Sequence, residues 1–184
     1  MAARDNRTPY DLYFSGKADI RDGCNMVGEG VGGKPYFFSF TTRAYAIDSD
    51  VTTTITNGKH EVLGTLTWGV ANYFGTFTTK YLTNKKSEFM SHLYMGGEGT
   101  EPAVVSNIDG VSFKILKLQD HTTYMMSAAT GNLLAGFVPE NVVSPHVGPI
   151  HGRLAFNFDN DELMLYALMS LCIVRWVDHS GTGL

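Results

Sequence analysis

The segment Asp161–Val177 limits what this chain can fold into more than any other part of the sequence. The preceding run Asp159–Glu162 favours a helix start there, because it supplies an N-cap and acidic residues that offset the helix dipole. The twelve residues Leu163–Val174 are apolar on all sides apart from one serine, which is typical of a helix that is fully buried or lies in a membrane. A membrane span needs about 20 apolar residues, and Arg175 interrupts this run. We therefore predict a buried helix.

Much of the remaining chain alternates large apolar residues with smaller or polar ones at a period of two, as strands with one buried face do. Hairpin turn sequences separate these runs, at Asn57-Gly58 and at Thr130-Gly131-Asn132. Short strands joined by tight turns indicate an antiparallel meander, closed as a barrel or stacked as a sandwich. Four sets of residues are each expected on one strand face: Tyr36, Phe38 and Phe40; Val62, Gly64, Leu66 and Trp68; Tyr73, Phe77 and Tyr81; and Leu154, Phe156 and Phe158.

Length and composition are those of one domain, residues 1–184, that can bury a sizeable core. The net charge of −4 provides no bulk attraction to nucleic acid or to an anionic membrane. Two cysteines, Cys24 and Cys172, are too few for a disulfide framework in a domain of this size, so we expect reduced thiols in packing or turn roles. The polar N-terminus has no apolar signal core, which predicts a cytoplasmic protein.

Glycine and proline concentrate in four segments that are expected to be long loops. Loops of this length are uncommon without a purpose, so a binding function would be placed there, although surface decoration is an equal alternative. The four expected loops are Gly16–Lys34, Asn84–Glu88, Gly96–Asn107 and Pro139–Gly152.

A β-barrel of hairpins around one C-terminal apolar helix resembles the tubby C-terminal-like superfamily, which includes the tubby domain, the phospholipid scramblases and the plant LURP-one-related proteins. The likeness is strongest to an uncharacterised branch from mushroom-forming fungi and covers about Tyr10 to His179, giving an expected core of about residues 10–179. The segments that carry it are Thr52–Ile55, Leu63–Trp68, Asp109–Lys114, Leu133–Phe137 with Gly152–Phe156, and Leu163–Val177.

This resemblance implies a mainly β fold, an antiparallel β-barrel of hairpins enclosing a C-terminal apolar α-helix. It also implies a non-enzymatic binding or interaction module, because members of the wider group bind phosphoinositides or other membrane ligands or act near membranes. The motifs are structural, so they point to fold more than to a ligand. An anionic lipid headgroup is the first candidate partner.

Basic residues are the candidate ligand-binding groups, since two short clusters that met in space would suit a phosphate headgroup or a nucleic-acid backbone. A solvated turn is the plainer explanation of the first cluster. The candidates are Lys80, Lys85 and Lys86 around one turn, with Lys114 and Lys117 on another strand.

Other motifs carry less. Gly28–Gly33 matches G-x-G-x-x-G, but Lys34, Pro35 and a strand follow instead of the helix that a dinucleotide site requires. His146 and His151 share one segment, with Glu140 as the nearest third ligand, but loop histidines are more often surface groups, so no metal or cofactor is predicted. The carboxylates to inspect are Glu29, Glu61, Asp109, Asp120, Glu140 and Glu162.

Two further classes of function stay open beside the binding module. One is a fungal defence protein, either a glycan-binding lectin or a toxin that hydrolyses N-glycosidic bonds in ribosomal RNA with a loop carboxylate. Its chemistry would need a carboxylate beside an aromatic pocket. The other is a structural protein that self-associates through exposed strand edges.

Overall fold

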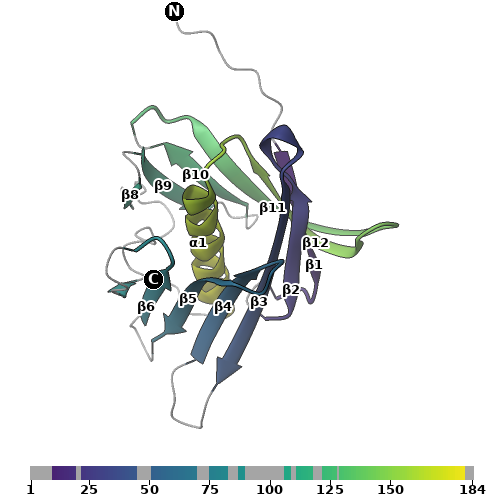
Figure 1. The fold of residues 1–184 in the computed structure, drawn as a ribbon, viewed down its shortest axis with the longest axis horizontal. Coiled ribbons are helices and arrows are strands. Elements are labelled where there is room, and N and C mark those ends of the chain that lie inside the picture. The colour runs from purple at the N-terminus through teal and green to yellow at the C-terminus, as the bar shows by residue number, and fades with distance from the viewer. Residues whose placement is uncertain are drawn as a thin grey trace, which may run out of the picture.

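The computed structural model describes residues 10–19, 22–44, 51–69, 75–82, 87–89, 106–108, 111–117, 122–127 and 129–180. In these ranges the chain forms twelve strands, one short 3-10 helix and one α-helix (Figure 1). The elements are β1 Tyr10–Gly16, β2 Cys24–Glu29, η1 Val31–Gly33, β3 Pro35–Ala44, β4 Val51–Asn57, β5 Val62–Trp68, β6 Gly75–Thr79, β7 Glu88–Phe89, β8 Ser106–Ile108, β9 Val111–Lys117, β10 Thr123–Ser127, β11 Leu133–Ser144, β12 Gly148–Phe156 and α1 Asp161–Ser180.

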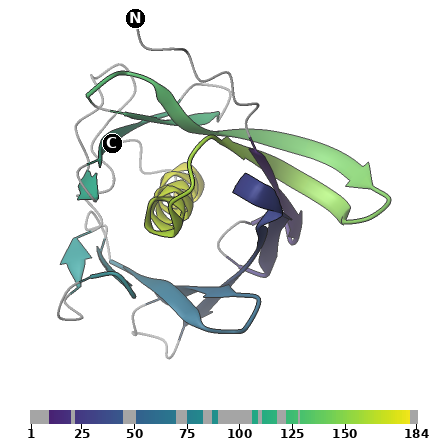
Figure 2. The ribbon, with the colours of Figure 1, turned by 45° about the horizontal axis from the view of Figure 1, so that its top comes forward.

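The predicted C-terminal helix exists and is enclosed by the sheet. Every residue from Leu163 to Val174 is buried, on all sides of the helix, as the apolar run requires. Figure 2 shows the curved sheet passing around α1, which lies on its concave side. The ring of Tyr166 packs edge-on against Phe77 of β6 and Phe113 of β9, with distances between ring centroids of 5.8 and 6.4 Å. One helix residue therefore touches strands from both halves of the sheet.

All strands belong to a single antiparallel sheet in the order β7-β6-β5-β4-β3-β2-β1-β12-β11-β10-β9-β8. The first and last strands of the sequence, β1 and β12, are neighbours near the middle of the sheet. β1 pairs with β12 on one side and with β2 on the other. In the ranges that the structure describes, no ladder joins the edge strands β7 and β8. The mainly β class and the enclosed helix are confirmed, but over the described residues the sheet is open between β7 and β8 and does not form a closed barrel.

The strand faces follow the predicted alternation with three differences. Tyr36, Phe38 and Phe40 are buried on one face as expected. Val62 was expected inside but is 55% exposed, because the register between β4 and β5 shifts after Ile55 and turns Leu63 inward instead. In the third set only Phe77 lies in β6, since Tyr81 follows the strand and Tyr73 is outside the described residues. In the fourth set Phe158 follows the end of β12.

The prediction of a loop is wrong for two of the four segments, because both contain strands. The segment Gly16–Lys34 contains β2, in which Cys24 is buried and Met26 faces the core. The segment Pro139–Gly152 is the outer part of a long β11–β12 hairpin, which projects beyond the body of the sheet (Figures 1 and 2). Glycine and proline occur there within paired strands and at a register shift between Pro139 and Val142. Of the other two expected loops, residues 84–86 and 96–105 lie outside the described residues, whereas Glu88 belongs to β7 and Ser106 and Asn107 belong to β8.

Both cysteines are buried thiols outside any disulfide, as predicted. Burial raises the pKa of the Cys24 thiol to about 12, so it is a neutral packing group. Within the described part of the chain, no helix combines the length and the apolarity needed to cross a membrane.

Candidate functional site

A pocket of about 370 Å³ opens at the end of the sheet where α1 begins. Its volume falls in the range of small-molecule sites, about 300–1,000 Å³. Three neighbouring strands (β3, β4 and β5), the segments next to them and after β6, and the first residue of α1 contribute to it, and we call it the helix-end pocket. Its lining residues are Lys34, Pro35, Tyr36, Phe37, Phe38, Asn57, Gly58, Lys59, Leu63, Lys80, Tyr81 and Asp161.

The carboxylate of Asp161 is the centre of the polar contacts in this pocket. Its Oδ1 accepts a hydrogen bond from Lys34 Nζ at 2.5 Å and a second from the Tyr36 hydroxyl at 3.0 Å. Lys34 Nζ also lies 5.1 Å from the centroid of the Tyr36 ring, within the range of a cation–π contact. The three side chains form one cluster, which joins the start of β3 to the start of α1.

Local structure explains why these groups meet. The 3-10 turn Val31–Gly33 reverses the chain between β2 and β3 and delivers Lys34 to the sheet end. Gly30 makes room beside it, because a Cβ there would lie 2.5 Å from Tyr36 Cε2. On the helix side, Asn160 caps α1 by accepting the Leu163 N–H at 2.8 Å, which places Asp161 in the first turn.

The cluster shifts the acidity of its members in consistent directions. Burial alone would raise the pKa of Asp161, but the hydrogen bonds from Lys34 and Tyr36 and the charges of Lys34 and Lys80 outweigh it, so the pKa falls below its ordinary 3.8. The Asp161 hydrogen bond raises the pKa of Lys34. Burial, with the nearby carboxylate, raises the pKa of Tyr36 to about 12. Near neutral pH the pair is therefore ionised and the phenol is a hydrogen-bond donor.

Two more lysines reach the same pocket from turns. Lys59 lies in the β4–β5 connection, which is longer than the predicted two-residue turn. Asn57 Oδ1 accepts the N–H groups of Lys59 and Glu61, at 2.9 and 3.0 Å, and His60 takes the positive φ expected of Gly58. Lys80 follows β6, with Nζ 4.9 Å from the centroid of the Tyr81 ring. Among the described residues, neither Lys59 nor Lys80 forms an ion pair.

Only part of the predicted lysine site lies within the described residues. Lys80 lines the helix-end pocket. Lys114 is in β9, opposite Met126 of β10, and Lys117 ends that strand. Lys114 does not line the pocket. Lys85 and Lys86 lie outside the described residues, so their part of the site stays a prediction.

The sequence reading did not select Lys34, Tyr36, Lys59 or Asp161 as site residues. Asp161 was predicted to lie at the start of the helix. Lys34 was noted as the residue that follows the Gly28–Gly33 motif where a dinucleotide site would need a helix. That interpretation of the glycine motif is confirmed, since the motif ends with the short turn η1 and is followed by β3 in place of an α-helix. Lys80 is the residue of this pocket that the sequence analysis had named as a candidate ligand-binding group.

The other residues singled out from sequence are dispersed. His146 is exposed in the β11–β12 turn, whereas His151 Nε2 lies 3.1 Å from the Gly16 carbonyl oxygen. Glu140 accepts a hydrogen bond from Arg153 Nε at 3.1 Å. In the described ranges no three His, Cys, Asp or Glu residues gather as metal ligands would. Of the six carboxylates to inspect, Glu29, Glu61, Glu140 and Glu162 lie outside the pocket lining, and Asp109 and Asp120 are not described.

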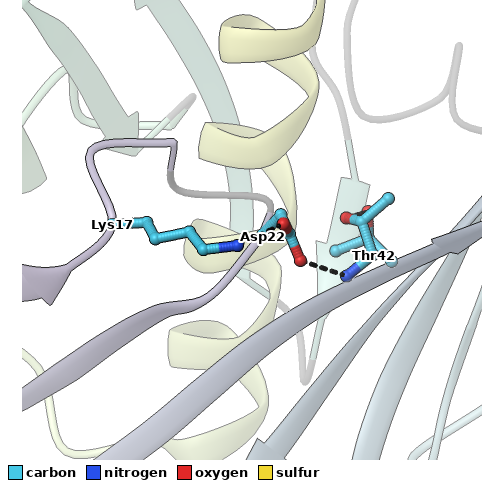
Figure 3. A network of polar contacts seen from close by, with 4 residues as sticks. Lys17, Asp22 and Thr42 are labelled. Atoms are coloured by element: carbon cyan, nitrogen blue, oxygen red, sulfur yellow. Dashed lines mark hydrogen bonds and ion pairs between the residues drawn. The ribbon is translucent and has the colours of Figure 1, made fainter.

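A second polar cluster fastens the β1–β2 connection to β3 (Figure 3). Asp22 pairs with Lys17 Nζ at 3.1 Å and accepts the Thr42 N–H at 3.3 Å. These hydrogen bonds lower the pKa of Asp22. The Gly23 N–H also donates to the Phe40 carbonyl at 2.8 Å. All these contacts hold the chain to itself, so we assign this cluster a structural role.

Comparison with known proteins supports the fold. No protein-family model matches the chain, and no curated protein matches it. The X-ray structure of a protein from Arabidopsis thaliana has a similar fold, with a TM-score of 0.50 at 11% identity over 93% of this chain and 92% of that one. At that identity the likeness concerns the fold alone. The fold is therefore the part of the predicted resemblance that this comparison supports, whereas the narrower likeness to a fungal branch is not supported.

Proposed function

We propose that the chain is a tubby-like binding module whose helix-end pocket takes an anionic, phosphate-type group joined to an apolar body. The observation that carries the proposal is the excess of positive charge. Three lysines line the pocket against one carboxylate, and that carboxylate is already engaged by Lys34. Lys59 and Lys80 have no ion pair within the described residues and are therefore available to a ligand anion.

The pocket walls favour a ligand that is not a bare ion. Tyr36, Phe38 and Leu63 provide buried apolar surface, and Phe37 is 42% exposed at the rim. Pockets of this kind are mostly apolar, with a few polar groups that orient the ligand. A phosphate ester with an aliphatic body, free or as part of a lipid, matches both parts of the lining, and glycerol 3-phosphate reproduces the phosphate-bearing end of such a lipid.

Two binding measurements separate the two sources of that chemistry. Calorimetric titration with inorganic phosphate and with glycerol 3-phosphate tests the free anion. Sedimentation with phosphatidylcholine vesicles, with and without phosphatidic acid, tests the lipid. We expect binding to glycerol 3-phosphate or to the acidic vesicles, and loss of it in the double variant Lys59→Gln/Lys80→Gln. A wild-type protein that binds none of these probes would overturn the proposal.

A matched control is available at another site on the protein. Lys17 is an exposed lysine outside the pocket, so Lys17→Gln removes a positive charge without touching the lining. Equal loss in Lys17→Gln would mean that net charge, and not the pocket, drives binding. A further variant, Lys85→Glu/Lys86→Glu, tests the lysine pair predicted from sequence. Loss there extends the site, whereas unchanged binding confines it to the pocket.

A further inference from the structure

The carboxylate of Asp161 lies where the pocket offers an oxyanion its strongest hydrogen bonds. Its Oδ1 accepts hydrogen bonds from the Lys34 ammonium and from the Tyr36 hydroxyl. Donors of this kind hold anionic oxygens in binding sites. The chain thus supplies its own anion to the lysine that begins β3. Lys59 and Lys80 line the same pocket without such a partner among the described residues.

This internal anion is held in place by the fold. The neighbouring residues Leu163 and Met164 are buried in the core, with 4% and 0% of their surface exposed, so the first turn of α1 is anchored. The Asn160 cap fixes the same turn from the other side. Because Asp161 is tethered beside Lys34, a ligand in free solution competes with a group of high effective concentration.

We infer that Asp161 restricts the helix-end pocket to ligands with one anionic group, because it holds Lys34 and repels a second anionic group that approaches it. The inference rests on the proposed function, since it concerns the ligand of the same pocket. One phosphate is accommodated by Lys59 and Lys80. A second phosphate on the same ligand would face Lys34, whose charge is already compensated by Asp161, and would be repelled by the carboxylate of Asp161.

The test compares two soluble anions, glycerol 3-phosphate with one phosphate group and inorganic pyrophosphate with two. For the wild-type protein we expect tighter binding of glycerol 3-phosphate. In Asp161→Asn the affinity for pyrophosphate is expected to rise about tenfold, as loss of one close like-charge contact predicts, with a smaller change for glycerol 3-phosphate. An unchanged ratio of the two dissociation constants would overturn the inference.

Two variants make the result specific. Glu162→Gln removes the same charge from the adjacent position of the helix, which does not line the pocket. If it raises the affinity for pyrophosphate as much as Asp161→Asn does, the general field of the helix end is responsible and the inference fails. In Lys34→Gln/Asp161→Asn the gain should be clearly smaller than in Asp161→Asn, because the second phosphate can no longer use the released Lys34 and only the loss of repulsion remains. A gain of the full size in the double variant also contradicts the inference.

Failure of the inference and failure of the proposed function give different results. If the wild-type protein binds neither anion but Asp161→Asn binds pyrophosphate, the restriction holds and the proposed ligand is wrong. If the wild-type protein binds both anions equally and Asp161→Asn changes nothing, the pocket binds anions without this restriction. Circular dichroism melting of each variant confirms folding, and Asp161→Ser replaces Asp161→Asn if the latter does not fold.

Discussion

Lys34 and Asp161 are separated by 127 positions in the chain, yet Lys34 Nζ lies 2.5 Å from Asp161 Oδ1. The first residue precedes β3 and the second begins α1. Their contact joins the sheet to the enclosed helix at the mouth of the helix-end pocket. The side chains are 42% and 49% exposed, so the pair contributes modestly to stability and more to the shape and charge of the pocket.

The pair makes stability depend on pH. We expect Asp161→Asn to lower the free energy of unfolding by about 0.5 kcal/mol at neutral pH, because water screens a half-exposed pair. Since the pKa of Asp161 is lowered in the folded chain, this contribution is complete above the ordinary value of 3.8 and is lost as pH falls through the folded pKa. Urea unfolding of both proteins at neutral pH and at about pH 2 measures it. A difference that is undiminished in acid would contradict the assignment.

Gly30 is expected to be required for the position of Tyr36. A methyl group at Gly30 would lie 2.5 Å from Tyr36 Cε2, so Gly30→Ala should push the ring and weaken its hydrogen bond to Asp161. We expect a loss of about 1–3 kcal/mol, typical of overpacking, with weaker anion binding. Thermal melting and titration with glycerol 3-phosphate measure the two effects. Gly58→Ala is the control for the melting measurement alone, because its methyl would stand at an ordinary 3.4 Å from Phe37 Cβ while Gly58 itself lines the pocket.

Gly75 begins β6 in a conformation that other residues rarely adopt. Its φ is +88°, and a Cβ would lie 1.9 Å from the Thr67 carbonyl oxygen. We expect Gly75→Ala to cost more than about 3 kcal/mol, because strain and a backbone clash add. Gly131, with φ of +70° and no atom within 4 Å of its Cβ position, is the comparison. Gly131→Ala should cost about 1 kcal/mol, and equal costs in denaturant unfolding would argue against the clash.

Two buried hydroxyl groups line one small cavity between α1 and the sheet. Ser170 Oγ and Thr123 Oγ1 are buried without hydrogen-bond partners in the described part of the chain, and both residues line this cavity with Phe137. Removing an unsatisfied hydroxyl spares its desolvation cost, so Ser170→Ala and Thr123→Val should leave stability unchanged or raise it by about 1 kcal/mol. Leu168→Ala on the same helix should instead lose about 2–5 kcal/mol. A clear loss of stability in Ser170→Ala, measured by denaturant unfolding, would reveal a bonded hydroxyl.

The predictability of the fold varied with the range of the interactions involved. The apolar run Leu163–Val174 predicted its own burial because no solvated face was left on that helix. Alternation predicted Tyr36, Phe38 and Phe40 as one buried face, since a pleated strand has a period of two. Val62 was misplaced because the register shift opposite Ile55 depends on the partner strand, which local alternation does not contain.

The hairpin β11–β12 shows the limit of composition as a guide. Glycine and proline in Pro139–Gly152 indicated a loop, yet the backbone pairs with its neighbour across much of this segment. Pairing is a long-range property, and proline is tolerated in a strand where its missing N–H is not needed for the ladder. The same reasoning applies to β2, which lies in a stretch that looked like a glycine-rich connection.

By itself the sequence determined the class of this protein: a mainly antiparallel β-sheet around a helix whose all-apolar surface needs to be enclosed. Those features arise from periodicity, which each segment carries alone. Only the tertiary structure decided that the sheet stays open between β7 and β8 in the described residues, and that Lys34, Lys59 and Lys80 meet Asp161 in one pocket. Strand register and the docking of α1 set that meeting, and both depend on contacts between residues far apart in the chain.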